Sequence, residues 1–200
     1  MALKYIVLMV LMLAPLMTAG TPVKLHFEPV KIGIEVIKSS HLETEIVRPT
    51  LIKLAEFDPR LYNEGAVKLM MGTAAQESDL GFYLRQHPRG PGKGWWSVED
   101  ATHTDIWRYL AKPSKTKLRD IVLSLARDKS LNPHPPHSEL IDNPPYSLAV
   151  ARIKYWMIST PMPDAGNLLA LGGYWDKFYN VNPVHGTAQE FVDSYNKYVK

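Results

Sequence analysis

An apolar helix with a carboxylate close to its end is the feature of this sequence that most constrains the fold. Asn63 is a suitable N-cap for this helix, and Gly81 is a residue that can end it. Helical steps back from Glu77 reach three residues of the stripe that should face the core, Ala74, Met70 and Val67. The pattern therefore places an acidic side chain among core residues.

A carboxyl group at this position should hold its proton more tightly than usual. Burial removes hydration from the charged form and raises the pKa of the group. The C-terminal end of a helix also carries partial negative charge, which disfavours ionisation further. We interpret Glu77 as a candidate general acid. The alternative is that Glu77 is a solvated residue at a fraying helix end.

Length and composition fit one globular core. The chain has 200 residues, of which 46% are hydrophobic and 22% are charged. Its net charge of +3 suits a polyanionic partner such as a cell wall, but it is too small to indicate nucleic-acid binding. The absence of cysteine excludes disulfides, thiol catalysis and cysteine zinc sites.

The N-terminus predicts export. Lys4 precedes an uncharged apolar run from Tyr5 to Met17, and small residues suited to cleavage follow at 18–20. This run is shorter than the roughly 20 residues of a membrane span. We interpret residues 1–20 as a secretory signal peptide, which places the protein in the periplasm, the cell envelope or outside the cell. The alternative is a retained signal anchor, which would hold the chain at a membrane through residues 4–19.

Behind this segment we expect an extended lead at residues 21–40 and one mainly α domain at residues 41–200. Alternation in Val30 to Ile37 predicts a strand within the lead. Periodicity, capping residues and prolines predict the helices of the domain. We expect helices at 41–47, 49–57, 63–81, 117–127 and 143 to about 159. For three further helices the sequence predicts the start: a capping box at 102–105, Asp164 or Asn167, and a capping box at Thr187.

Residues 85–98 form the loop richest in special residues. Three glycines and two prolines prescribe an irregular path, and two adjacent tryptophans follow, Trp95 and Trp96. Neighbouring side chains of an extended chain point to opposite sides. We therefore expect one of the two tryptophans to be exposed and to form the wall of a cleft, whereas most of the later aromatics, Trp107, Trp156, Trp175 and Phe178, should be packing residues.

Two histidines in a proline-rich loop, His134 and His137, are the pair that suggests a metal. The sequence places no carboxylate or cysteine close to them. Because a metal site in a protein normally needs more than two ligands, we do not expect a metal site here.

Three short motifs occur in a meaningful order: Glu77-Ser78, the Gly94–Thr102 segment and Tyr179-Asn180. This order resembles the lysozyme-like superfamily, especially lytic transglycosylases and goose-type lysozymes. In that superfamily a catalytic Glu-Ser ends a helix, a Gly-x-x-Gln segment follows, and a Tyr-Asn lies near the C-terminus. Phage-type proteins with soluble lytic transglycosylase (SLT) domains are also similar across residues 45–200, in 72–78, 83–86, 101–103 and 174–175.

The resemblance implies a peptidoglycan-cleaving enzyme that needs no metal or organic cofactor. Glu77 would protonate the glycosidic oxygen between MurNAc and GlcNAc, and would then act as a base on the sugar's own hydroxyl to give a 1,6-anhydro product. In this scheme Gly94 lets the backbone approach the substrate, and Tyr179 and Asn180 line the cleft and help to orient Glu77 or the sugar. The implied substrate-binding residues are Ser78, Gly94, Trp95, Ser97, Tyr179 and Asn180.

The sequence also departs from the family pattern. Ser97 stands where the family has Gln, Trp95 replaces a small or aliphatic residue, and Asp100 replaces a proline. A hydrolase would need a second carboxylate, for which the candidates are Glu99, Asp100 and Asp105. The alternative function is a catalytically inactive lysozyme-fold protein that binds glycan, or serves as a structural part of a virion or envelope complex.

Overall fold

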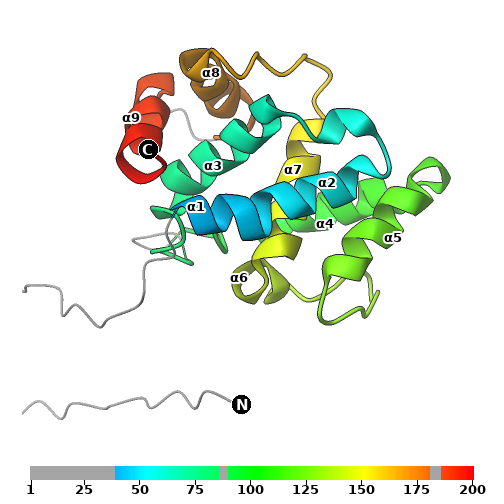
Figure 1. Cartoon of the computed structure of the whole chain (residues 1–200). Coiled ribbons are helices and arrows are strands. Elements are labelled where there is room, and N and C mark those ends of the chain that lie inside the picture. Colours follow the sequence, from blue (N-terminus) through cyan, green and yellow to red (C-terminus); the bar gives the residue numbers. More distant parts are fainter. Residues whose placement is uncertain (1–38, 86–89, 181–185) are drawn as a thin grey trace, which may run out of the picture. The chain divides into compact units, whose positions relative to one another are not determined.

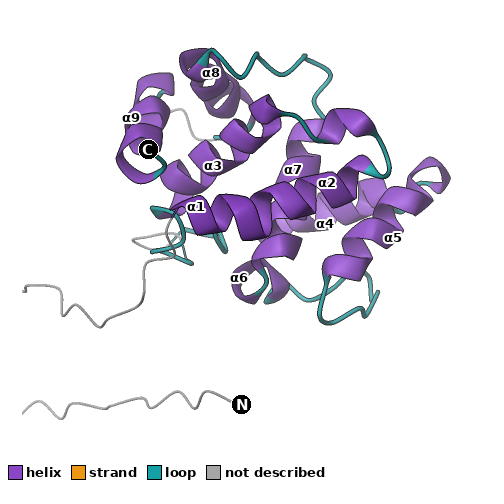
Figure 2. Cartoon of the chain, in the orientation of Figure 1, coloured by secondary structure: helices purple, strands orange, loops and turns teal. Residues whose placement is uncertain are grey.

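The computed structural model describes residues 39–85, 90–180 and 186–200 (Figure 1). These residues are mainly helical, and no strand occurs in the three ranges (Figure 2). The prediction of a mainly α domain is therefore confirmed for the described part of the chain. The expected signal segment and the strand at 30–37 lie outside it. In the three described ranges, no helix is both long and apolar enough to cross a membrane.

The first helical run is continuous where we predicted two helices. It comprises α1 (Ser39–His41), the π-helical η1 (Leu42–Val47) and α2 (Arg48–Ala55). Pro49 lies in the first turn of α2 and does not separate two elements. Proline lacks the amide hydrogen and crowds the carbonyl four residues earlier. The wider π-helical turn before it is the local distortion that lets the run continue.

Helix α3 (Glu64–Ser78) carries the residues on which the sequence argument rests. Asn63 caps it as predicted, because its side chain accepts the Ala66 amide at 2.8 Å. The predicted end at Gly81 is wrong, since the helix ends at Ser78 and Asp79 takes the left-handed conformation with φ 51°. Aspartate tolerates this conformation better than most residues. A short 3-10 helix, η2 (Pro59–Leu61), precedes α3.

Helix α3 packs against α8 (Leu168–Phe178) and α9 (Ala188–Tyr198), which lie beside it in Figure 1. Glycines make these contacts close. A Cβ on Gly72 would lie 2.1 Å from the ring Cζ of Phe191, and a Cβ on Gly172 would lie 2.5 Å from the Ala188 carbonyl oxygen. Small residues at these two positions therefore set the spacing of the three helices.

Helix α7 (Pro144–Trp156) is buried along most of its length, as predicted. It is in contact with α2, with α4 (Asp100–Leu110), with α5 (Thr116–Leu125) and with α6 (Glu139–Asp142). A second 3-10 helix, η3 (Pro113–Lys115), connects α4 to α5. Three helix-capping predictions are confirmed by hydrogen bonds from backbone amides to the caps Asn143, Asn167 and Thr187.

The predicted start of α4 is wrong. The capping box at 102–105 lies inside the helix, which begins at Asp100 after Glu99. The Thr104 hydroxyl donates back to the Asp100 carbonyl at 2.9 Å, and Asp105 pairs with Arg108. Serine and threonine can make such backward bonds within a helix as well as capping one. The motif alone could not distinguish these two uses.

The contact between α3 and α9 gives a first testable prediction. Gly72→Ala should lower the free energy of unfolding by roughly 1–3 kcal/mol, because its methyl group would overlap the Phe191 ring. Gly173→Ala is the matched control, since a Cβ there would meet nothing within 4 Å. That control should be neutral or stabilising, because alanine favours a helix over glycine. Urea unfolding of both variants measures the difference, and equal stability of the two would contradict the packing described.

Candidate functional site

The three motifs found in the sequence are joined by hydrogen bonds. The Ser78 hydroxyl donates to the carbonyl oxygen of Trp95 at 2.7 Å. The Tyr179 hydroxyl donates to the carbonyl oxygen of Trp96 at 2.6 Å. The indole of Trp175, one turn before Tyr179, donates to Glu77 Oε1 at 2.9 Å. The end of α3, the loop before α4 and the end of α8 therefore form one site.

Glu77 has an environment that favours its protonated form. Its side chain is half-buried, and this burial is the main cause that raises the pKa of Glu77 to about 7. The Trp175 hydrogen bond and the charge of Lys154 oppose the shift, whereas the charge of Glu99 adds to it. The carboxyl group can therefore hold a proton at neutral pH and release it in the same range.

Lys154 is a site residue that sequence reasoning missed. It lies on α7, where its Nζ donates to the Tyr179 carbonyl oxygen at 2.9 Å and sits 3.8 Å from the centre of the Tyr179 ring. Burial lowers the pKa of Lys154, while the charges of Glu77 and Glu99 raise it. A lysine on a mostly apolar helix was the available signal, because a buried cation needs partners.

Ser78 and Gly94 have structural roles in this arrangement. Ser78 is buried, and its hydroxyl also accepts the Gly81 amide at 2.9 Å. Gly94 has φ +72°, and a Cβ on it would lie 1.8 Å from the Leu140 carbonyl oxygen. The close approach predicted at Gly94 is thus made to the chain's own backbone.

The prediction that one of the two adjacent tryptophans is exposed is wrong. Trp95 is 7% exposed and Trp96 is 0% exposed. The Trp95 ring covers Gly81, and the Trp96 indole donates to the Met70 carbonyl oxygen at 2.9 Å. Both side chains pack inward because residues 94–97 form a tight turn and not an extended strand.

Ser97 and the Tyr179-Asn180 pair complete the set of predicted residues. Ser97 is half-buried and left-handed with φ 48°, and it ends the turn that Lys93 and Val98 close. Tyr179 is buried and stacks on Tyr155 at 4.9 Å, and burial raises the pKa of its hydroxyl well above the ordinary value. Asn180 is half-buried beside it. Tyr179 therefore acts as a neutral donor that fixes the loop.

The three candidate second carboxylates differ in their partners. Asp100 pairs with Lys93 at 2.6 Å and with His137 at 3.1 Å. Asp105 pairs with Arg108 on the surface of α4. Glu99 is half-buried, and its charge acts on both Glu77 and Lys154. Glu99 is therefore the candidate that belongs to the environment of Glu77.

A surface hollow of about 590 Å³ lies elsewhere, between α2 and α5. None of the predicted site residues borders it. Most of its lining side chains are charged or polar, and the lining consists of Lys53, Glu56, Thr116, Lys117, Asp120, Ile121 and Ser124.

Comparison with protein families, with characterised proteins and with solved structures found no match to this chain.

The raised pKa of Glu77 gives a second prediction. Below pH 4.5 the carboxyl is protonated in both states, but between pH 4.5 and about 7 only the unfolded chain releases its proton. The stability that Glu77 contributes is therefore lost as the pH rises through this range. Glutamine at position 77 is neutral at every pH. The free energy of unfolding of Glu77→Gln, relative to that of the parent, should therefore increase by up to about 3 kcal/mol as the pH rises through this range.

Urea unfolding of the parent and of Glu77→Gln across this range measures the effect. Glu190→Gln is the matched control, because Glu190 is exposed on α9 and its replacement should leave the pH profile of the parent unchanged. A difference between Glu77→Gln and the parent that stays constant with pH would show that the Glu77 pKa is not raised.

Proposed function

We propose that this protein cleaves the glycan strands of peptidoglycan through a lysozyme-like domain at residues 41–200, with Glu77 as the general acid. The observation that carries the proposal is the half-buried Glu77 carboxyl, whose pKa burial raises to about 7. A group with this pKa can protonate a leaving oxygen at neutral pH. The hydrogen bonds that join the three motifs, and the Trp175 bond to the carboxyl itself, support the same proposal.

The neighbours of Glu77 suit proton transfer. The Trp175 indole holds Oε1 at 2.9 Å, so the other carboxyl oxygen remains to carry the proton. This proton would pass to the glycosidic oxygen between MurNAc and GlcNAc as the bond to that oxygen breaks. The charge of Lys154 then stabilises the carboxylate that remains.

The same carboxylate can complete the reaction without water. In the lytic transglycosylase route it accepts the proton of the sugar's own C6 hydroxyl, whose oxygen closes the 1,6-anhydro ring. In the hydrolase route a second carboxylate activates water instead. Glu99 is the candidate for that carboxylate, because its charge acts on the pKa of Glu77. We propose the transglycosylase route, because it needs only the one carboxyl group whose pKa fits the task.

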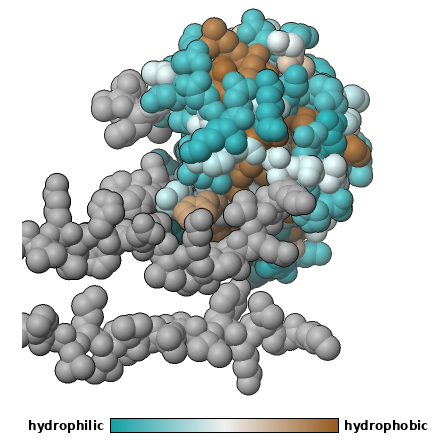
Figure 3. All heavy atoms as spheres, turned by 60° about the vertical axis from the view of Figure 1, so that its left-hand side comes forward, coloured by the Kyte–Doolittle hydropathy of each residue, from teal (hydrophilic) through white to brown (hydrophobic). Residues whose placement is uncertain are grey.

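Exposed aromatic side chains directly after α3 could receive the sugar rings. Phe82 is 63% exposed and Tyr83 is 44% exposed, with ring centres 4.8 Å apart. Aromatic faces stack on the apolar faces of sugars, and these two residues follow Glu77 closely in the chain. The described residues that can be seen in Figure 3 are mostly hydrophilic, with smaller hydrophobic areas. Export, as the N-terminal sequence predicts, would bring the domain to this substrate.

Cleavage of purified peptidoglycan by Glu77→Gln tests the acid. The variant should lose at least about 100-fold in the rate of turbidity decrease, because glutamine cannot donate a proton of comparable acidity. The activity of the parent should fall as the pH rises through about 7, where Glu77 loses its proton. Glu190→Gln should keep the activity of the parent. Equal rates for Glu77→Gln and the parent, or no cleavage by either, would contradict the proposal.

Mass analysis of the released muropeptides tests the route. The parent should produce 1,6-anhydro ends, and Glu99→Gln should still produce them, because Glu77 serves as both acid and base. Reducing ends from the parent, together with an inactive Glu99→Gln variant, would instead show hydrolysis with Glu99 as the second carboxylate.

A further inference from the structure

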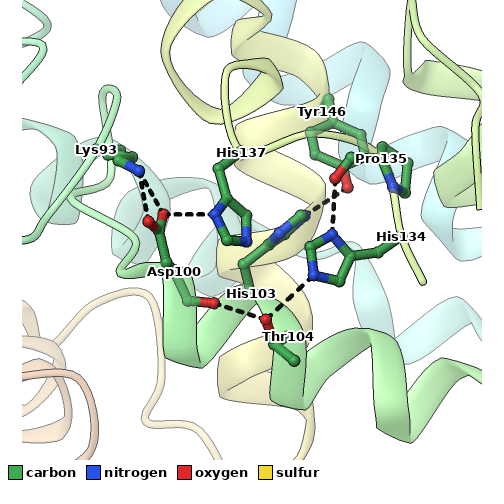
Figure 4. Close-up of polar contacts among 8 residues, drawn as sticks. All are labelled: Lys93, Asp100, His103, Thr104, His134, Pro135, His137 and Tyr146. Carbon is green, nitrogen blue, oxygen red and sulfur yellow. Dashed lines mark hydrogen bonds and ion pairs between the residues drawn. The ribbon is translucent and has the colours of Figure 1, made fainter. Parts of the chain in front are cut away.

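Three histidines from two separate parts of the chain come together beside α4 (Figure 4). His103 lies on α4 and is fully buried, whereas His134 and His137 are half-buried residues of the loop before α6. One nitrogen from each ring can be chosen so that the three atoms lie within 4.8 Å of one another. This cluster takes no part in the proposed cleavage reaction.

The spacing of the rings matches that of imidazoles around one metal ion. The ring centres are 4.6 Å apart for His103 and His134, 5.1 Å for His103 and His137, and 4.9 Å for His134 and His137. With metal–nitrogen bonds of about 2.0–2.1 Å in tetrahedral geometry, ring centres lie about 5 Å apart. A metal ion would draw the nitrogens somewhat closer without moving the rings far.

The hydrogen bonds of the two loop histidines determine which nitrogen is left for a ligand. His137 Nδ1 lies 3.1 Å from the Asp100 carboxylate, and His134 Nδ1 lies 2.8 Å from the Pro135 carbonyl oxygen. Both oxygens only accept, so in a neutral ring each Nδ1 carries the hydrogen and each Nε2 keeps its lone pair. At His134 this Nε2 also lies 3.1 Å from the Thr104 hydroxyl, a contact that a metal ion would have to replace. His137 Nε2 is buried without a hydrogen-bond partner.

His103 supplies the third nitrogen. Its Nδ1 is buried without a hydrogen-bond partner. Its Nε2 lies 2.6 Å from the Tyr146 hydroxyl, whose oxygen also accepts the Trp107 indole at 2.7 Å. Nδ1 can bind a metal in the tautomer in which Nε2 carries the hydrogen and donates it to that oxygen. The ring is fully buried, and burial favours the neutral imidazole, the form that binds metals. Two orphaned buried nitrogens in one cluster are costly unless a ligand occupies the space between them.

We propose that His103, His134 and His137 bind one divalent transition-metal ion of the zinc class, through Nδ1 of His103 and Nε2 of the other two. Imidazole ligands suit this class, and water would fill the fourth position. Asp100, the Pro135 carbonyl and Tyr146 are the outer partners that ligating histidines usually have. The ion would fasten the loop before α6 to α4.

Metal binding by the full chain without a histidine tag tests this proposal. After chelator treatment, calorimetric titration should show one Zn²⁺ per chain, with Kd at or below about 1 µM. His134→Ala and His137→Ala should each raise Kd at least about tenfold. His41→Ala is the matched control, because His41 is exposed on α1 and should leave Kd unchanged. Zn²⁺ should also raise the Tm of the parent and of His41→Ala, but not that of the loop variants.

Co²⁺ offers a second measurement on the parent chain, which holds even if a variant fails to fold. Bound Co²⁺ should give the strong visible absorption of a tetrahedral nitrogen-ligated ion. No stoichiometric binding of Zn²⁺ at about 100 µM, or equal affinities of the parent and both loop variants, would overturn the proposal. Neither readout involves peptidoglycan, so failure here is distinct from failure of the proposed function.

Discussion

The hydrogen bond between the Trp175 indole and Glu77 is the contact on which the site depends. It holds a carboxyl group in a place where burial alone would make its charge costly. Burial and hydrogen bonding act on the Glu77 pKa in opposite directions, and burial prevails. Three further hydrogen bonds hold the surrounding elements together. Ser78 and Tyr179 bind the carbonyls of Trp95 and Trp96 in the loop before α4, and Lys154 of α7 binds the end of α8.

Much of the fold could be predicted from local patterns. Asn63, Asn143 and Thr187 were identified as caps because their short side chains bond to amides within three residues, a purely local event. The errors arose where local rules compete. Pro49 lies in the first turn of α2 as expected, but the box at Thr102 falls inside α4. The same residue types can cap a helix or bond backward within one, as Thr104 does to Asp100.

The site could be predicted in part for the same reason. The position of Glu77 on a core stripe follows from helical periodicity, so its burial was predictable. The orientation of Trp95 and Trp96 depends on a tight turn and on the carbonyl of Met70 in α3, which is far away in the sequence. This orientation could therefore not be predicted. Lys154 reaches the site only because α7 passes beside Tyr179. The roles of Trp175 and Lys154 are tertiary facts that no short motif records.

The histidine cluster likewise depends on tertiary contacts, here between α4 and the loop before α6. The pair at His134 and His137 was recognisable, but the third ligand lies on α4 and the carboxylate partner, Asp100, begins that helix. Asp100 follows Glu99 directly, and Glu99 acts on the pKa of Glu77. An ion bound by the histidines would hold Asp100 through His137 and so fix the first turn of α4. The two proposed sites would then hold two parts of one segment, because Ser78 and Tyr179 bind the carbonyls of Trp95 and Trp96, and His137 binds Asp100.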